Sequence, residues 1–87
     1  MKLSVIIPLR NEEQIVERNI QAIHSFFVAS GVDFELIVVD DSDDGTYPIL
    51  LDLQQRLEHL AVHQGGEKKG YGAAVRLGFQ HAKGEVL

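Results

Sequence analysis

The 87-residue sequence contains no cysteine, no tryptophan and only two prolines. Without cysteine the chain can form no disulfide, no thiolate metal site and no cysteine nucleophile, so a reducing compartment is permitted. Its apolar runs are far shorter than the roughly 20 residues that a membrane-spanning helix needs. The amino terminus also lacks the long apolar core of a signal peptide. We therefore expect a soluble, cytoplasmic protein.

Positive charge is also scarce. There are 8 Lys and Arg against 13 Asp and Glu, for a formal net charge of −5. Nonspecific binding to nucleic acid or to an anionic membrane demands a basic face, so neither is expected as a partner. Hydrophobic residues make up 45% of the chain, enough for the core of one small globular domain or of a piece of a larger one.

Short apolar runs alternate with stretches of helical periodicity. The run from Leu3 to Ile7 predicts a strand that Pro8 ends, and Asn11 with Gln14 has the spacing of a capping box that starts a helix. Val16, Ile20, Ile23 and Phe27 give that helix its apolar stripe, widened by Ile15 and Phe26, and Ser30-Gly31 ends it. The complete pattern predicts strands over 3–7, 35–39 and 60–62 and a fourth beginning at 85, with helices from about 11 to 30, from 46 to 57 and from about 72 to 83.

This alternation predicts the α/β class. We expect a Rossmann-like parallel sheet with helices on both faces, in the order β-α-β-α-β-α and the start of a further strand. Because the sequence stops as that strand begins, the fold would be incomplete. A half-domain exposes apolar surface, so we expect it to associate with itself or with a missing complement.

The stretch Glu35–Thr46 organises the chain, because a branched apolar run breaks into four carboxylates, a glycine and a threonine. Ligands of open α/β sheets bind beyond the carboxyl ends of such strands. The loops at 8–12, at 40–46 and at 65–72, the last with Lys68 and Lys69, would meet at that edge. Carboxylates suit base N–H and ribose hydroxyl groups, while lysines and glycine N–H groups suit phosphates. The combination indicates a nucleoside diphosphate accompanied by Mg²⁺ or Mn²⁺.

The same residues also have purely structural interpretations. Asp40 would hold its loop through backbone N–H groups, and Asp41 could cap the following turn. Glu12 could simply favour a helix N-terminus. Arg10 and the two lysines could be solvated surface charges.

Other functional classes fit less well. Gly70-Tyr71-Gly72 has no third glycine and does not follow the first strand, so it is no dinucleotide fingerprint. Four acids in one turn do not face each other across a glycosidic bond. A receiver-like signalling domain would need an aspartate after the third strand, and none is there. The histidines at 24, 59, 63 and 81 show no metal-ligand spacing.

Five segments in order carry a family resemblance. They are Ser4–Pro8, Asn11-Glu12, Val38–Thr46, Lys69–Ala74 and Gly84-Glu85. Together they resemble the start of a family 2 glycosyltransferase with the A-type nucleotide-sugar fold, closest to the polyprenyl-phosphate mannose or glucose synthase branch. The resemblance covers essentially the whole chain.

The resemblance implies site residues. It implies a nucleoside pocket lined by Pro8, Arg10 and Glu12, base and ribose contacts from Val39 and Asp41, and Lys69 near the phosphates. Arg10 stands where the family commonly has an aromatic residue, so its guanidinium would stack on the base instead. The acidic loop is one residue shorter than in the commonest form of the motif.

The implied function is that of a donor-binding half. Residues 1–87 would be the truncated amino-terminal part of a hexosyltransferase that moves a sugar from a GDP- or UDP-linked donor to an acceptor such as a lipid phosphate, at the cytoplasmic face of a membrane. The family's metal-binding Asp-x-Asp follows the strand that begins at Glu85 and is absent here. We therefore assign no catalytic or metal residue, and we expect no cation on this chain alone. The alternative is a non-catalytic half-domain that self-associates.

Overall fold

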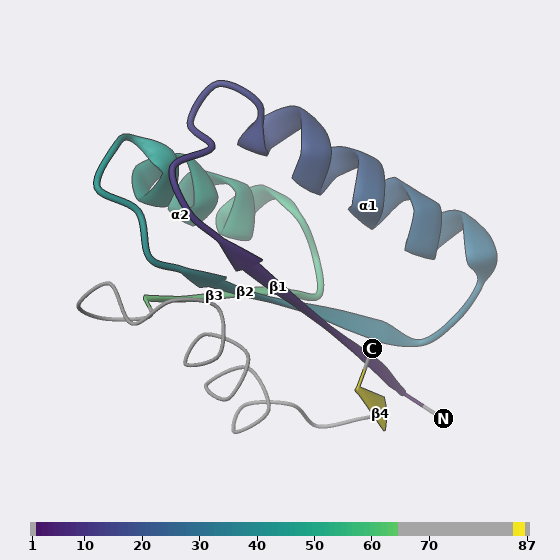
Figure 1. Cartoon of the computed structure of the whole chain (residues 1–87). Helices are drawn as coiled ribbons and strands as arrows, with labels where there is room; N and C mark the ends of the chain where they lie inside the picture. Colours follow the sequence, from purple (N-terminus) through teal and green to yellow (C-terminus); the bar gives the residue numbers. More distant parts are fainter. Residues whose placement is uncertain (1, 65–84, 87) are drawn as a thin grey trace.

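The computed structural model describes residues 2–64 and 85–86 (Figure 1). The four strands of the described chain form one parallel sheet in the order β3-β2-β1-β4. This confirms the α/β class and the parallel sheet. The elements are β1 (Leu3–Leu9), α1 (Val16–Ser30), β2 (Phe34–Asp40), α2 (Thr46–Arg56), β3 (Leu60–Gln64) and β4 (Glu85–Val86).

Helices α1 and α2 cover the same face of the sheet (Figure 1). Each joins a strand to its parallel neighbour, β1 to β2 and β2 to β3, and successive right-handed crossovers in one direction put their helices on one side. The expected third helix over 72–83 lies outside the described residues, and with it the expectation of helices on both faces. Neither α1 nor α2 is long and apolar enough to cross a membrane.

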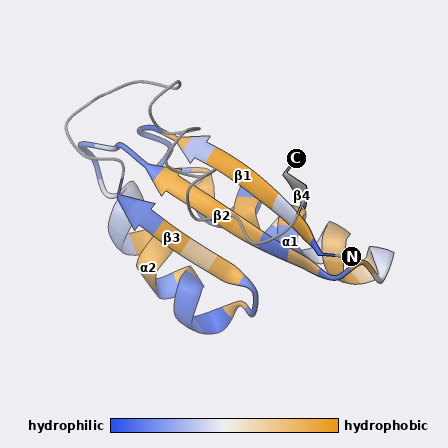
Figure 2. Ribbon diagram, turned by 90° about the horizontal axis from the view of Figure 1, so that it is seen from below, coloured by the Kyte–Doolittle hydropathy of each residue, from blue (hydrophilic) through white to orange (hydrophobic). Residues whose placement is uncertain are grey.

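Strand β2 is the centre of the core and is buried along its whole length. Its apolar run reflects its position between β1 and β3, which Figure 2 shows as hydrophobic colour along the strands. Leu36 and Val38 belong to the cluster on the helix side, where they join Ile20 of α1 with Leu50 and Leu53 of α2. The exposed fraction of each of these five residues is 1% or less.

Helix α1 begins later than its sequence pattern predicts. Val16 and Ile20 are buried as expected, but Ile15 is 38% exposed and Phe26 67% exposed, so these two do not widen the core stripe. The predicted end is confirmed, because Gly31 closes the helix with φ 75°, a left-handed conformation that glycine adopts without strain.

Pro8 lies inside β1 and does not end it. It is the register partner of Val39 in β2. The Leu3 N–H and the Leu9 carbonyl both bond toward β2, to Asp33 and Asp41. Since successive residues of a strand point their backbone groups to alternate sides, the nitrogen of Pro8 faces away from β2 and its missing N–H removes no bond there.

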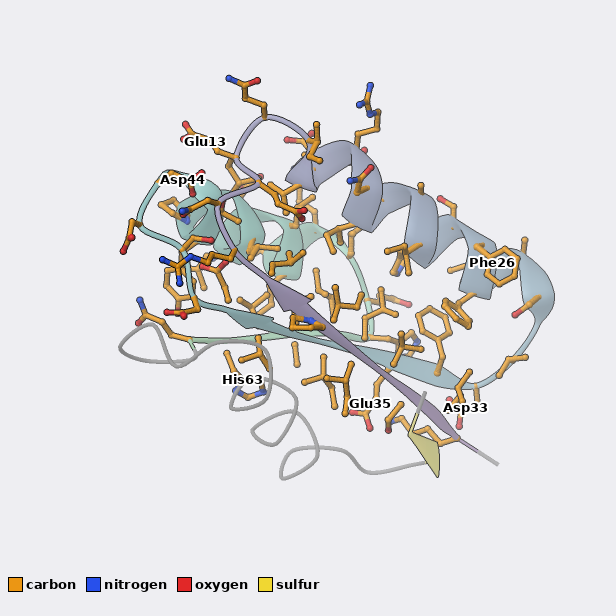
Figure 3. All side chains as sticks on the ribbon, in the orientation of Figure 1. Glu13, Phe26, Asp33, Glu35, Asp44 and His63 are labelled. Carbon is orange, nitrogen blue, oxygen red and sulfur yellow. The ribbon has the colours of Figure 1, made fainter. Side chains whose placement is uncertain are left out.

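The sheet face opposite the helices carries a buried polar pair. The Ser4 hydroxyl donates to Glu35 Oε2 at 2.5 Å, and the two residues are register partners in β1 and β2. Figure 3 shows Glu35 and His63 pointing to this face, away from α1 and α2. The polar pair is thus separate from the apolar cluster under the helices.

Strand β1 is where the chain changes direction across the sheet. From β1 the chain moves outward through β2 to β3, and β4 then pairs with the other side of β1 through Leu3 and Ser4. In doubly wound sheets the carboxyl end of such a strand opens onto a crevice. The segment that follows Leu9 therefore stands at the position where ligands of this architecture bind.

Candidate functional site

Two polar loops meet at the carboxyl edge of the sheet. The first loop (10–15) follows β1, and the second loop (41–45) follows β2. The register places Leu9 beside Asp40, and the Asp41 N–H donates to the Leu9 carbonyl at 3.0 Å. Arg10 and Asp41 therefore begin their loops side by side, as the sequence predicted for loops after parallel strands.

Arg10 spans two carboxylates of the second loop. Its guanidinium lies 3.6 Å from Asp41 Oδ2 through one terminal nitrogen and 3.8 Å from Asp43 Oδ2 through the other. The Arg10 side chain is 47% exposed and the Asp41 side chain only 13%. At these distances both ion pairs are loose, and the Arg10–Asp43 pair, which is exposed on both sides, stabilises the fold by about 0–1 kcal/mol. Arg10 thus keeps donor capacity for a ligand.

Asp40 is the buried acid of the site. Its side chain is fully buried, and its Oδ1 accepts from the Ser42 hydroxyl at 2.6 Å. Its Oδ2 has no hydrogen-bond partner among the described residues. Burial raises the pKa of Asp40, and the hydrogen bonds from Ser42 oppose that rise only in part. Asp40 therefore holds the start of the second loop through Ser42, whereas the Asp41 side chain is 13% exposed and pairs with Arg10.

Asp44 has the opposite electrostatic character. Hydrogen bonds from Thr46, through its hydroxyl at 2.5 Å and its N–H at 2.9 Å, lower the pKa of this exposed carboxyl. Thr46 is the first residue of α2, and Gly45, which has no side chain, occupies the N-cap position. The Asp44 carboxylate instead meets the first N–H of the helix.

The remaining predicted site residues differ in how deeply they are buried. Pro8 and Val39 lie in the strands, and the Val39 side chain is fully buried, so Val39 could meet a ligand only through its backbone. Glu12 is half-buried and lies on the rim of two shallow hollows of about 350 and 410 Å³. Lys69 lies outside the described residues, as does the loop at 65–72.

Sequence reasoning was wrong about Asn11. It does not cap α1, whose N-cap position is Ile15 without a side-chain bond. The Asn11 side chain instead accepts from the Asp43 N–H at 2.8 Å, and the backbone N–H of Asn11 donates to the Ser42 hydroxyl at 2.7 Å. Its φ of 51° is left-handed, a conformation in which asparagine is enriched. That preference is the one signal in the sequence that could have indicated this role.

The described residues do not form a metal site. Within 2–64 and 85–86, no group of three His, Cys, Asp or Glu side chains is arranged to hold an ion. The carboxylates nearest the edge are occupied by Arg10, Ser42 and Thr46. His24 contacts the Glu58 carbonyl at 2.8 Å and packs edge-on against Phe34, far from this edge.

The chain matches a known family over nearly its full length. Residues 4–87 match the family model described as Glycosyl transferase family 2. A dolichol-phosphate mannosyltransferase from Pyrococcus furiosus is 36% identical over 88 residues, covering 100% of this chain and 24% of the relative.

Solved structures share the same fold. A crystal structure of S. aureus TarS matches with a TM-score of 0.79 and 33% identity over 100% of this chain and 26% of that one. The mannosyltransferase PcManGT from Pyrobaculum calidifontis, solved in complex with GDP-Man and Mn²⁺, matches with a TM-score of 0.75 and 26% identity over 97% of this chain and 25% of that one. The chain thus spans about a quarter of the length of these relatives.

Proposed function

Because the chain belongs to glycosyl transferase family 2, we propose that the carboxyl edge of its sheet binds the nucleoside diphosphate of a donor sugar. The observation that most supports this is that Arg10 and Asp41, each directly after a different strand, meet at that edge with a guanidinium nitrogen 3.6 Å from Asp41 Oδ2. The Asp41 carboxylate can accept from base N–H or ribose hydroxyl groups. The exposed guanidinium of Arg10 can stack on the base.

The other proposed contacts surround this pair. Pro8 and the backbone of Val39 would form the floor of the nucleoside pocket, and Glu12 its side. Lys69 would meet the phosphates, a role that rests on the family resemblance alone. Residues 1–87 would then be the nucleotide-binding half of a longer transferase domain.

For the whole protein we propose transfer of a hexose from a GDP- or UDP-linked donor to an acceptor, with a lipid phosphate as the leading candidate. One relative is named a dolichol-phosphate mannosyltransferase, and a structural neighbour was solved with GDP-Man and Mn²⁺. We assign the divalent cation to residues beyond those described, because the described residues do not form a ligand group for it. The 87-residue chain alone would bind nucleotide without transferring sugar.

A calorimetric titration of the 87-residue chain with GDP and with UDP tests the proposal. We expect binding that weakens at least about tenfold in Asp41→Ala, because a hydrogen bond to a charged group contributes about 1.5–3 kcal/mol. Asp52→Ala is the matched control, since Asp52 lies on α2 and pairs with Arg56 at 2.8 Å, away from the edge. Absence of binding by the folded wild type would overturn the proposal.

A self-associating half-domain is the second candidate, favoured by apolar side chains near the end of α1. Phe26 is 67% exposed, Val28 57% and Val32 43%, and Figure 3 shows Phe26 pointing outward. A light-scattering mass tests it. This candidate predicts an oligomer that Phe26→Ser dissociates and that binds neither nucleotide, whereas a monomer would exclude it.

A further inference from the structure

Three successive backbone N–H groups of the first loop donate to side chains of the second loop or of Thr46, the first residue of α2. The Asn11 N–H donates to Ser42 Oγ at 2.7 Å, and the Glu12 N–H to Thr46 Oγ1 at 3.0 Å. The Glu13 N–H lies 3.4 Å from Asp44 Oδ2, the longest of the three. Figure 3 shows Glu13 and Asp44 close together at this end of the molecule.

The hydroxyls of Ser42 and Thr46 each also donate a hydrogen bond to a carboxylate. Ser42 Oγ donates to Asp40 Oδ1 at 2.6 Å, and Thr46 Oγ1 donates to Asp44 Oδ1 at 2.5 Å. Each hydroxyl therefore accepts one bond and donates another, which fixes its proton and strengthens both bonds. The result is two parallel relays, each running from a backbone N–H of the first loop through a hydroxyl to an aspartate.

Backbone N–H groups of the second loop also donate to side chains of the first loop. The Asp43 N–H donates to Asn11 Oδ1 at 2.8 Å, and the Gly45 N–H donates to Glu13 Oε1 at 3.0 Å. We call the whole set the clasp, meaning the hydrogen bonds between residues 11–13 and residues 42–46. Its partners lie 31 to 34 residues apart in the chain.

The clasp acts on the residues proposed to bind the ligand. Asn11 stands between Arg10 and Glu12, so a fixed Asn11 backbone determines where both side chains start. The bonds of Asn11 are exposed, and an exposed bond adds little to a fold whose core is the buried cluster under α1 and α2. The clasp therefore matters more for orientation than for stability.

We propose that Asn11 and Ser42 are positioning residues for nucleotide binding, because they hold Arg10 and Glu12 in register with Asp41. This inference rests on the proposed function of the edge. Neither residue needs to touch the ligand. Ser42 is the central member, since its hydroxyl links Asn11 to the buried carboxylate of Asp40.

The test uses the 87-residue chain and three substitutions, two of which form a matched pair at Ser42. Ser42→Ala removes the hydroxyl, and Ser42→Thr keeps it. Asn11→Gly removes Oδ1 but tolerates the left-handed φ of 51°. Titrated with GDP and UDP, Ser42→Ala and Asn11→Gly should each bind about tenfold more weakly, and Ser42→Thr should bind as the wild type. The double variant should lose less than the product of the two single losses, because both substitutions remove bonds of the same clasp around Asn11.

Amide exchange of the nucleotide-free protein supplies a readout independent of binding. The Asn11 N–H should exchange faster in Ser42→Ala than in the wild type or Ser42→Thr. If the wild type binds nucleotide and Ser42→Ala and Asn11→Gly bind it equally well, the positioning role is overturned while the proposed function stands. If the wild type binds neither nucleotide, the proposed function fails and the positioning role with it, whatever the exchange rates.

Discussion

The pKa values of Asp40, the last residue of β2, and of Asp44, in the second loop, are shifted in opposite directions because the surroundings of the two carboxyls differ. Burial raises the pKa of Asp40, whereas hydrogen bonds from Thr46 lower the pKa of Asp44. The two groups therefore act on stability in opposite senses. Asp44 favours the folded state while it is ionised, and Asp40 favours it while it is protonated.

Replacement of Asp44 should change the acid sensitivity of the fold. Its pKa is lowered from 3.8 on folding, so its contribution is complete above 3.8 and is lost as the pH falls through the lower folded-state value. We expect Asp44→Asn to lower the free energy of unfolding at neutral pH and the difference from wild type to shrink at pH values below 3.8. Denaturant unfolding at a series of pH values measures this.

Asp33→Asn is the control for the loss of one negative charge, because Asp33 lies at the opposite end of the sheet (Figure 3). A difference between wild type and Asp44→Asn that grows on acidification would contradict the assignment of this carboxylate to Thr46.

Asn11 illustrates why sequence reasoning fails for some single residues. Its spacing to Gln14 is a local signal, and it predicted a helix cap. In the structure its bonds go to Ser42 and Asp43, which are 31 and 32 residues away. A pattern read within one turn contains no information about such partners. Arg10 and Asp41, by contrast, could be placed from the sequence because each directly follows a strand.

At the scale of elements, α2 shows how helical spacing separates core from surface. Leu50 and Leu53 are fully buried, whereas Leu51 between them is 37% exposed. This separation arises because a helix that packs on a sheet buries an apolar stripe of period 3.6 and exposes the residues between. The same rule overestimated the width of the apolar stripe of α1, since Ile15 precedes the first turn and Phe26 points outward.

Truncation of two leucines in α2 should separate their roles. We expect Leu53→Ala to lower the free energy of unfolding by about 2–5 kcal/mol, because it leaves a cavity in a closed core. Leu51→Ala, with the same chemical change on the exposed side, should cost less than about 1 kcal/mol. Denaturant unfolding measures both, and equal losses would contradict the described orientation of α2.

The end of α1 offers a test of backbone conformation alone. Gly31 has φ 75° and nothing lies within 4 Å of a Cβ added to it. Gly31→Ala should therefore cost about 1–2 kcal/mol through the left-handed conformation and leave nucleotide binding unchanged.

Gly45→Ala is the counterpart to that substitution. Gly45 has φ −81°, which alanine adopts freely, but its Cβ would lie 2.7 Å from Glu13 Oε2. We expect little backbone strain and a displaced Glu13. Thermal unfolding compares the two variants, and a larger loss in Gly45→Ala than in Gly31→Ala would contradict this account.

At the scale of the whole molecule, the position of the site follows from topology. Parallel strands were predictable from alternating apolar runs and helices, and their carboxyl ends had to share one edge. The strand order was not predictable from local patterns, because pairing of β4 with β1 depends on contacts across the sheet. That order makes β1 the strand at which the chain changes direction, and it leaves Arg10 at the crevice.

The central claim is that a nucleoside diphosphate binds at this edge, and amide chemical-shift mapping of the 87-residue chain during titration with GDP and UDP tests it most directly. The account predicts shifts at Arg10, Glu12 and Asp41 that saturate together. It predicts no shifts at Val32 and His59, which lie just before the amino ends of β2 and β3. Shifts confined to Val32 and His59, or no shifts at saturating nucleotide, would contradict it.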